Sequence, residues 1–407
     1  MKKSLKITAL MLMVSLLLTG CALLPTAISD TVRNHTGDTV TISVQEYEQL
    51  LQYKELEEMR QVVREYYYQE PDEQAMLDGA AMGLLYGLDD PYTFYYDPEA
   101  FAEMWEEDEG DYVGIGIQIM ADYTTGLCTI TRVFLDSPAL EVGLRRGDIL
   151  TKVDDLDVVA TNLQEAVDIM RGEEGKTVNV QVLRGDQLLD FVVTRRGVHT
   201  TWVNSCMLEN SIGYISLYEF AGDCSSSFAI QMDNLVAQGA QALIIDLRDN
   251  PGGWVDDANR LADLFLPKGN LASLVYRDGT TEYYTTTTDG KESNIPLVVL
   301  VNEYSASASE ILSGALQDFG RATIVGTQTY GKGVVQYVLP VGTRGAGMQL
   351  TVAQYFTPNG HEVHKVGITP DVIAEWPEGD DNMYELGDLA DAQLKVAYDV
   401  ALEKIGK

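Results

Sequence analysis

The sequence has few basic residues, since 28 lysines and arginines stand against 62 aspartates and glutamates, a formal net charge of −34. Nucleic-acid binding requires clustered Lys and Arg, and so does docking on anionic lipid through a basic patch. The scarcity therefore argues against both function classes. The deficit is uneven, because residues 46–111 hold 20 acidic and only 3 basic groups.

Cysteine is also scarce: the chain has 4, at Cys21, Cys128, Cys206 and Cys224. No C-x-x-C spacing occurs, which argues against a zinc cluster or a thiol redox motif. A Cys206–Cys224 disulfide is conceivable in an oxidising compartment, but buried free thiols are the favoured interpretation. We expect no metal site.

Several familiar catalytic and nucleotide-binding motifs are missing or incomplete. The sequence has neither G-x-S-x-G nor S-x-x-K, which excludes a nucleophile elbow and the penicillin-binding arrangement. The His361–His364 segment is one residue shorter than H-E-x-x-H. Gly326–Lys332 matches the start of a P-loop, but Gly333 stands where a Ser or Thr would hold Mg²⁺. We expect no cofactor.

The N-terminus is typical of an export signal. Lys2, Lys3 and Lys6 precede an apolar run, residues 7–18, that is short for a membrane span. The run ends in Leu-Thr-Gly-Cys at residues 18–21, which resembles the bacterial lipobox. This predicts cleavage after residue 20 and lipidation of Cys21. An uncleaved anchor helix is the alternative, and either interpretation predicts an exported protein.

The 407 residues and 45% hydrophobic content predict a folded chain of two or three domains. Apolar residues at helical spacing predict helices over 44–68 and 75–88. Short alternating strands fill 112–195, with a helix at 162–170. From Ile212 on, buried strands alternate with helices, which favours an α/β sheet. We predict strands at 213–220, 242–247, 296–301 and 323–325, and helices at 225–237 (N-capped by Ser225), 254–265, 307–319 and 388–405.

Three segments after buried strands have residues suited to chemistry. Val301–Glu310 contains the run Ser-Ala-Ser-Ala-Ser at the start of a helix, where small side chains and free N–H groups suit an oxyanion. Asp246–Gly253 ends in two glycines, which permit unusual backbone angles. Thr329–Gln336 places a lysine between two glycines. An N-cap, a plain turn and a solvated lysine are the alternative interpretations.

Together these segments resemble the carboxyl-terminal processing peptidases, also called tail-specific serine proteases. The resemblance extends from about Ala75 to Asp371, with the motifs in family order. The matching segments are Leu88–Tyr92, Gly114–Ile117, Ser137–Ala139, Arg171-Gly172, Asp246–Gly253, Ser305–Glu310, Tyr330–Gly333, Phe356–Gly360 and Gly367–Asp371.

The resemblance implies a fold of mixed α/β class (α+β overall). It comprises a crotonase- or ClpP-like protease core, an inserted PDZ domain of β-barrel-like form, and N-terminal helices. Together with the patterns above, the resemblance predicts six divisions of the chain. The first three are a lipoprotein signal peptide (1–20), a tether (21–43) and a helical region (44–99). The last three are the PDZ domain (100–196), the protease core (197–375) and an acidic tail with a helix (376–407).

The resemblance also implies a Ser–Lys mechanism. Ser307 is the implied nucleophile, Lys332 the general base, and Gln336 the residue that orients the lysine. Lys332 must be neutral to accept the Ser307 proton, so we expect it in an apolar, dry environment. We assign the oxyanion hole to the backbone N–H groups of Gly253 and Ala308. Ser305 and Ser309 are expected to be structural.

The PDZ-like insert implies capture of substrate C-termini. We expect the loop of Gly114, Ile115, Gly116 and Ile117 to bind a terminal carboxylate while the peptide adds a strand to the sheet edge. The family insert can also gate the active site, with Arg171 the candidate relay and a plain surface arginine its alternative.

The expected partners are proteins or peptides with free C-termini, at the outer face of the bacterial cytoplasmic membrane or on the periplasmic side. Two other functions stay open, an inactive PDZ scaffold that binds protein tails and a hydrolase of cell-wall material. The helix at 44–68 predicts either a homodimer contact or intramolecular packing.

Overall fold

The computed structural model describes residues 41–109, 111–134, 137–199, 201–287, 294–377 and 384–407. The described residues up to Met76 and those from Leu77 to Lys407 form two compact units. In the first, α2 (Val44–Leu51) starts at a capping box in which Ser43 and Glu46 exchange hydrogen bonds, and α3 (Lys54–Tyr66) follows. Neither helix has a buried residue, so the acidic side chains here are solvated. The expected signal peptide and Cys21 lie outside the described residues.

A short segment of the chain precedes the inserted domain. It consists of α4 (Glu73–Tyr86), β1 (Phe94–Tyr96) and α5 (Pro98–Glu109). The inserted domain (residues 111–199) has a sheet with strand order β3-β4-β5-β7-β8, β6 beside β5, and a separate β2–β9 pair. Its strands are β2 (Asp111–Gly114), β3 (Ile117–Asp122), β4 (Leu127–Val133), β5 (Ile149–Val153), β6 (Leu156–Asp157), β7 (Thr177–Arg184), β8 (Gln187–Thr194) and β9 (Arg196–His199); its helices are α6 (Pro138–Val142), η2 (Ala160–Asn162) and α7 (Leu163–Met170).

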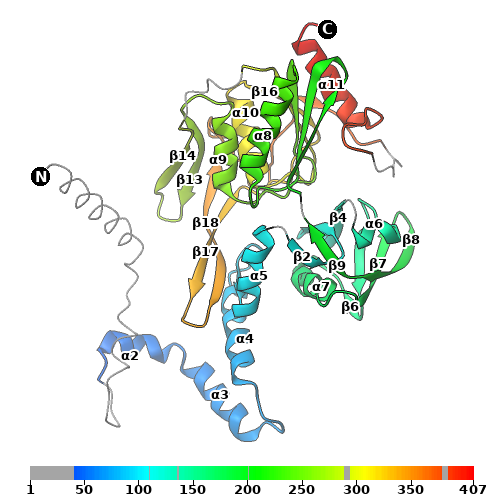
Figure 1. Ribbon diagram of the computed structural model, residues 1–407. Coiled ribbons are helices and arrows are strands. Elements are labelled where there is room, and N and C mark those ends of the chain that lie inside the picture. The colour runs from blue at the N-terminus through cyan, green and yellow to red at the C-terminus, as the bar shows by residue number, and fades with distance from the viewer. Residues whose placement is uncertain (1–40, 110, 135–136, 200, 288–293, 378–383) are drawn as a thin grey trace, which may run out of the picture. The chain divides into compact units, whose positions relative to one another are not determined.

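The core of the protein is a sheet with strand order β10-β11-β12-β15-β16-β19, in which only β10 runs antiparallel to its neighbour (Figure 1). The strands are β10 (Val203–Leu208), β11 (Ile212–Leu217), β12 (Ala242–Asp246), β15 (Leu297–Val301), β16 (Ala322–Gly326) and β19 (Val372–Ile373), with η3 (Glu209–Ser211) after β10. Helices lie on the connections from β11 to β12, from β12 to β15 and from β15 to β16, as the alternating pattern predicted, whereas the connection from β16 to β19 contains two strands, residues 334–341 and 346–356.

Both faces of this sheet are buried, which explains its unbroken apolar strands. Alternate residues such as Leu243 and Ile245 pack with α8 (Cys224–Ala237), α9 (Val255–Asp263) and α10 (Ala308–Asp318). The intervening Ala242 and Ile244 pack with α11 (Ala392–Lys404) on the other face. Figure 1 shows α8, α9 and α10 on one side of the sheet and α11 on the other.

A second sheet has strand order β1-β18-β13-β14, with β17 paired to β18. It contains β13 (Asn270–Tyr276), β14 (Thr281–Thr285), β17 (Val334–Val341) and β18 (Ala346–Phe356). In Figure 1, β17 and β18 form a long orange hairpin. The N-terminal end of β17 directly follows the Thr329–Gly333 loop, so this sheet positions the lysine segment.

The structure confirms the mixed α/β class and refines several elements. The helix expected over 44–68 is interrupted at residues 52–53, between α2 and α3. The Ser225 N-cap prediction was wrong: Asp223 is the N-cap, and Ser225 lies inside α8, where its hydroxyl donates to Asp257. Leu163 begins the helix expected from residue 162, and Ala392 begins the one expected from residue 388, where Asp391 is the N-cap.

Cys128 and Cys224 are buried, Cys206 is half-buried, and none of these three forms a disulfide in the described part of the chain. The buried-thiol interpretation therefore holds for Cys128 and Cys224 but not for Cys206, and the Cys206–Cys224 disulfide is excluded. Burial raises the pKa of Cys128 to about 11, which makes this thiol unreactive near neutral pH. Among the described residues, no helix is both long and apolar enough to cross a bilayer.

Candidate active site

The two glycine- and serine-containing loops meet at one edge of the core sheet. They follow β12 and β15, which are parallel neighbours, so their carboxyl ends lie side by side. Ser305 Oγ donates to Leu247 O at 2.7 Å, and Ser309 Oγ donates to Asn250 O at 3.0 Å. These serines join the two loops, which matches the structural role expected of them.

Ser307 sits at the turn into α10 in an uncommon conformation. Its φ is 55° and its ψ −115°, outside the regions that L-residues normally occupy. Its N–H donates to Glu310 Oε2 at 2.9 Å, and its carbonyl accepts from the Tyr355 hydroxyl at 3.1 Å. The side chain is nearly buried, with the residue 9% exposed. Strain held in place by surrounding contacts is characteristic of functional positions.

The glycine pair of the other loop packs against this turn. Gly252 and Gly253 have φ of 107° and 125°. A Cβ on Gly252 would lie 2.7 Å from Ser307 Cβ, and one on Gly253 would lie 2.2 Å from Phe220 O. In the described part of the chain, neither Gly253 N–H nor Ala308 N–H has a protein acceptor. These groups, assigned to the oxyanion hole, are therefore available to a substrate.

Lys332 belongs to a loop that Glu310 connects to the turn at Ser307 by hydrogen bonds. Glu310 is fully buried, and its carboxylate accepts from Lys332 N at 2.9 Å, Gly331 N at 2.7 Å and Thr329 Oγ1 at 2.6 Å. Gly333 packs so closely that a Cβ would lie 2.1 Å from His364 N. The glycines around the lysine therefore serve close backbone packing.

The environment of the Lys332 amine favours its neutral form. Burial lowers the pKa of Lys332 to about 8, against the opposite influence of the Glu310 and Asp90 charges. The Tyr92 ring covers the amine, with Nζ 4.9 Å from the ring centroid, and so contributes to its burial. A lysine with such a pKa can act as a general base near neutral pH, and the role of Lys332 as the base stays a prediction.

Gln336 lines the same cavity as Ser307 and Lys332. Its amide Nε2 donates to Thr351 Oγ1 at 3.1 Å. Within the residues described, no hydrogen bond joins Lys332 Nζ to Ser307 or to Gln336. Catalytic contacts are often long in substrate-free enzymes, so the orienting role of Gln336 stays a prediction.

The cavity has a volume of about 620 Å³ and is lined by both the core and the inserted domain. Ser307, Lys332 and Gly253 lie on its core side. The inserted domain also lines the cavity, with Tyr112, Ile117, Gln118, Phe134 and Arg171. Trp105 and Trp254 stack at 5.7 Å on the same cavity, so its wall is partly aromatic.

The inserted domain has the features expected for peptide capture. β3 is the last strand of its sheet and has one edge without a neighbour among the described strands. Gly116, just before it, has φ of 81°, and a Cβ there would meet Ser137 Cβ at 2.3 Å. Ile115 is buried and accepts from Ala139 N at 2.9 Å. Arg171 stacks on Tyr112, with Cζ 5.0 Å from the ring centroid.

The structure adds residues to which sequence reasoning assigned no role. Glu310 was detectable, because Ser307 and Glu310 have the S-x-x-E spacing of a capping box. Tyr92 lay in a quoted motif, but nothing in the sequence placed its ring over the lysine. The cross-loop pair of Asp249 and Asn302 had no sequence signal, since the two residues are 53 positions apart.

Comparison with known proteins agrees with this architecture. The family model of Peptidase family S41 matches residues 211–374, a PDZ domain model matches 129–184, and the model "Activating protease CtpB N-terminal domain" matches 24–100. The Carboxy-terminal-processing protease of Bartonella bacilliformis is 35% identical over 341 residues, which are 81% of this chain and 76% of the relative.

The chain belongs to the carboxyl-terminal processing peptidases. The Carboxy-terminal processing protease CtpA of Bacillus subtilis is 33% identical to the peptidase, across 85% of this chain and 75% of the relative. A solved photosystem II D1 C-terminal processing protease superposes with a TM-score of 0.67 at 26% identity, covering 88% of this chain and 98% of that one. The peptidase is therefore of the serine type, with an inserted PDZ domain.

Proposed function

We propose that this peptidase cleaves proteins whose free C-termini its PDZ domain captures, through a Ser307–Lys332 acyl-enzyme mechanism. One observation carries the proposal: the same cavity is lined by the catalytic residues and by the carboxylate-loop side of the PDZ domain. A tail that enters along this wall reaches the nucleophile without leaving the protein surface. The names of the relatives, carboxy-terminal processing proteases, agree with this substrate class.

The proposed reaction begins with proton transfer from Ser307 Oγ to the neutral Lys332 amine. The oxygen attacks the scissile carbonyl carbon, and the resulting oxyanion accepts hydrogen bonds from Gly253 N–H and Ala308 N–H. The lysine ammonium then donates its proton to the leaving amine as the C–N bond breaks. Water hydrolyses the serine ester in a second, analogous cycle, which restores the free serine.

Substrate capture rests on the edge of β3. A peptide that adds as a strand to this edge places its terminal carboxylate at the loop Gly114–Ile117, where main-chain N–H groups serve as donors. Because backbone dipoles bind the carboxylate, the strongly negative net charge of the protein does not prevent capture.

The decisive experiment compares an unfolded protein substrate bearing a free C-terminus with the same protein amidated at that end. Wild type should cleave the free form faster, and Ser307→Ala should cleave neither. Equal cleavage of both forms would contradict PDZ-directed capture. Tail binding without hydrolysis by wild type would instead identify a scaffold.

We further propose that the peptidase acts outside the cytoplasm, anchored through lipid on Cys21. The support is the N-terminal sequence, Lys2 to Cys21. Incorporation of labelled fatty acid into wild type but not Cys21→Ala would be expected, together with loss of the variant from the membrane fraction. Equal labelling of both proteins would refute the anchor.

A further inference from the structure

We propose that Arg146, a residue of the PDZ domain, is a positioning residue of the peptidase centre. Its guanidinium holds Asp249, and Asp249 in turn holds the loop that ends at the oxyanion donor Gly253. The inference rests on the proposed Ser–Lys peptidase function and gives the PDZ domain a second task besides tail capture.

The contact between the two domains is a forked ion pair. Arg146 Nε lies 2.5 Å from Asp249 Oδ2, and Nη2 lies 2.9 Å from Oδ1. The Arg146 side chain is 31% exposed and that of Asp249 only 16%. The Arg146 guanidinium also stacks on Trp376, with Cζ 4.8 Å from the ring centroid. Bidentate geometry with partial burial gives an ion pair more orientational control than an exposed one has.

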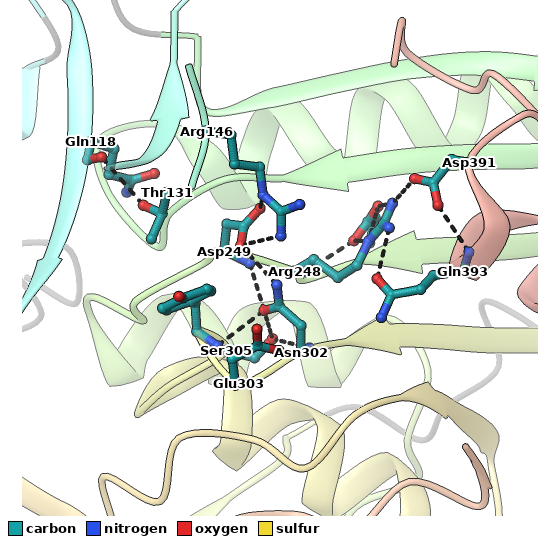
Figure 2. A network of polar contacts seen from close by, with 12 residues as sticks. Gln118, Thr131, Arg146, Arg248, Asp249, Asn302, Glu303, Ser305, Asp391 and Gln393 are labelled. Atoms are coloured by element: carbon teal, nitrogen blue, oxygen red, sulfur yellow. Dashed lines mark hydrogen bonds and ion pairs between the residues drawn. The ribbon is translucent and has the colours of Figure 1, made fainter. Parts of the chain in front are cut away.

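Asp249 is itself strained and sits between both catalytic loops. Its φ is 60°, in the left-handed region that costs a non-glycine residue free energy. Its N–H donates to Asn302 Oδ1 at 2.9 Å, and Asn302 Nδ2 donates back to Asp249 Oδ1 at 2.7 Å. Figure 2 shows Arg146 reaching Asp249 from one side while Asn302 reaches it from the other.

Asn302 extends the network to the nucleophile turn. Its N–H donates to Ser305 Oγ at 2.9 Å, and Ser305 lies two residues before Ser307. On the other branch, Asn250 Oδ1, directly after Asp249, accepts from Gly252 N at 2.9 Å. Through Asp249, Arg146 is thus connected by hydrogen bonds to the loop that carries the proposed nucleophile and to the loop that carries the proposed oxyanion donor.

Removing Arg146 leaves a poorly exposed carboxylate facing the Asn302 amide without its cation. An unpaired, desolvated charge is costly, so Asp249 is expected to turn toward solvent and relieve its positive φ. The loop would then release Gly252 and Gly253 from their present backbone angles. Oxyanion stabilisation depends on donors held in place before the reaction, so kcat should fall more than substrate binding.

The test uses a short peptide substrate with an amidated C-terminus, which bypasses tail capture. Full-length Arg146→Ala should show a kcat lower by at least about tenfold, equivalent to about 1.4 kcal/mol in the barrier, with KM within about twofold. Arg145→Ala is the matched control, because Arg145 is adjacent and exposed; its kcat should equal that of wild type. Arg146→Lys, which cannot form the fork, should fall between wild type and Arg146→Ala.

A double-mutant cycle separates positioning from general damage. Asp249→Asn removes the charge but keeps a residue that tolerates positive φ. If the pair acts as a unit, Arg146→Ala in the Asp249→Asn background should lower kcat by less than about twofold. Additive losses of kcat in the double variant would overturn the proposal. An unchanged kcat in Arg146→Ala would also overturn it, and so would a raised kcat, which would show that the contact with Arg146 inhibits the peptidase. Failure of wild type to hydrolyse the peptide would count against the proposed function instead.

Discussion

Ser307 and Lys332 are bound through their backbone N–H groups to the same carboxylate oxygen, Oε2 of Glu310, at 2.9 Å each. Glu310 is fully buried and its other oxygen accepts from Gly331 N and Thr329 Oγ1. Burial raises the pKa of Glu310 while these donors oppose that shift. A single carboxylate therefore sets the distance between the segments that carry the proposed nucleophile and the proposed base.

Glu310→Gln should disable the enzyme although the side chain keeps its size. The glutamine amide has only one acceptor oxygen, so some of the N–H groups that now donate to the carboxylate would face the amide NH₂ in the protein interior. Each unpaired N–H group would lower the free energy of unfolding by roughly 1–3 kcal/mol. We expect kcat to fall at least about a hundredfold, as for a lost oxyanion donor. Glu303→Gln is the control, because Glu303 is an exposed glutamate, and both variants are compared by peptide hydrolysis and by urea unfolding. The control should change the free energy of unfolding by less than about 0.5 kcal/mol. Equal effects of both substitutions would contradict the bridging role.

The pH dependence of kcat/KM should report Lys332. The pKa of this lysine is lowered to about 8, and only the neutral amine accepts the serine proton. The rate should therefore rise with pH, reach half its maximum near pH 8, and fall about tenfold per unit well below it. Lys332→Arg should be inactive even at high pH, since guanidinium stays protonated. A rate independent of pH from acid to alkaline conditions would exclude a titrating base.

Ser307→Gly and Ser307→Ala should both be inactive yet differ in stability. Ser307 has φ of 55°, which glycine adopts without strain and alanine does not. The glycine variant should resist thermal unfolding better than the alanine variant, by about 1 kcal/mol in the free energy of unfolding. Calorimetry of the two inactive proteins measures this difference without interference from self-cleavage. An alanine variant as stable as the glycine variant would show that the turn is unstrained.

Gly253→Ala should abolish turnover by displacing the oxyanion donor. The new Cβ would lie 2.2 Å from Phe220 O, and the backbone has φ of 125°. The expected loss in kcat is about a hundredfold or more. Gly126→Ala is the matched control, because that glycine also has a positive φ, 78°, but open space around its Cβ position. If Gly126→Ala loses as much activity as Gly253→Ala, the steric argument fails, and if Gly253→Ala keeps the wild-type rate, the assignment of its N–H to the oxyanion hole fails.

Much of the fold could be predicted from the sequence because its signals are local. Strands such as Ala242–Asp246, which is apolar up to its final aspartate, and Leu297–Val301, which is apolar throughout, are followed by turn residues, and this pattern marks them as buried parallel strands. Boundaries were less accurate, because helix starts depend on caps such as Asp391, whose neighbours are set by tertiary packing.

The candidate site likewise has features that the sequence predicted and features that it did not predict. Small residues and glycines marked the three loops as candidates for close approach of a substrate backbone, and the family resemblance then implied the roles of Ser307, Lys332 and Gly253. The cavity that they share with the PDZ domain was not assigned, since it depends on how the two folded domains pack.

By itself, the sequence determined the class of fold and the alternation of strands and helices in the core, since both follow from patterns within short windows, while the proposed roles of Ser307, Lys332 and Gly253 came from the resemblance of several motifs to a known family. Only the tertiary structure decided what surrounds those residues. The Glu310 contact with Lys332 joins positions 22 apart, and the Arg146 contact with Asp249 joins positions 103 apart. No local pattern specifies such pairs, because they form only when separately folded segments bury the same charges together.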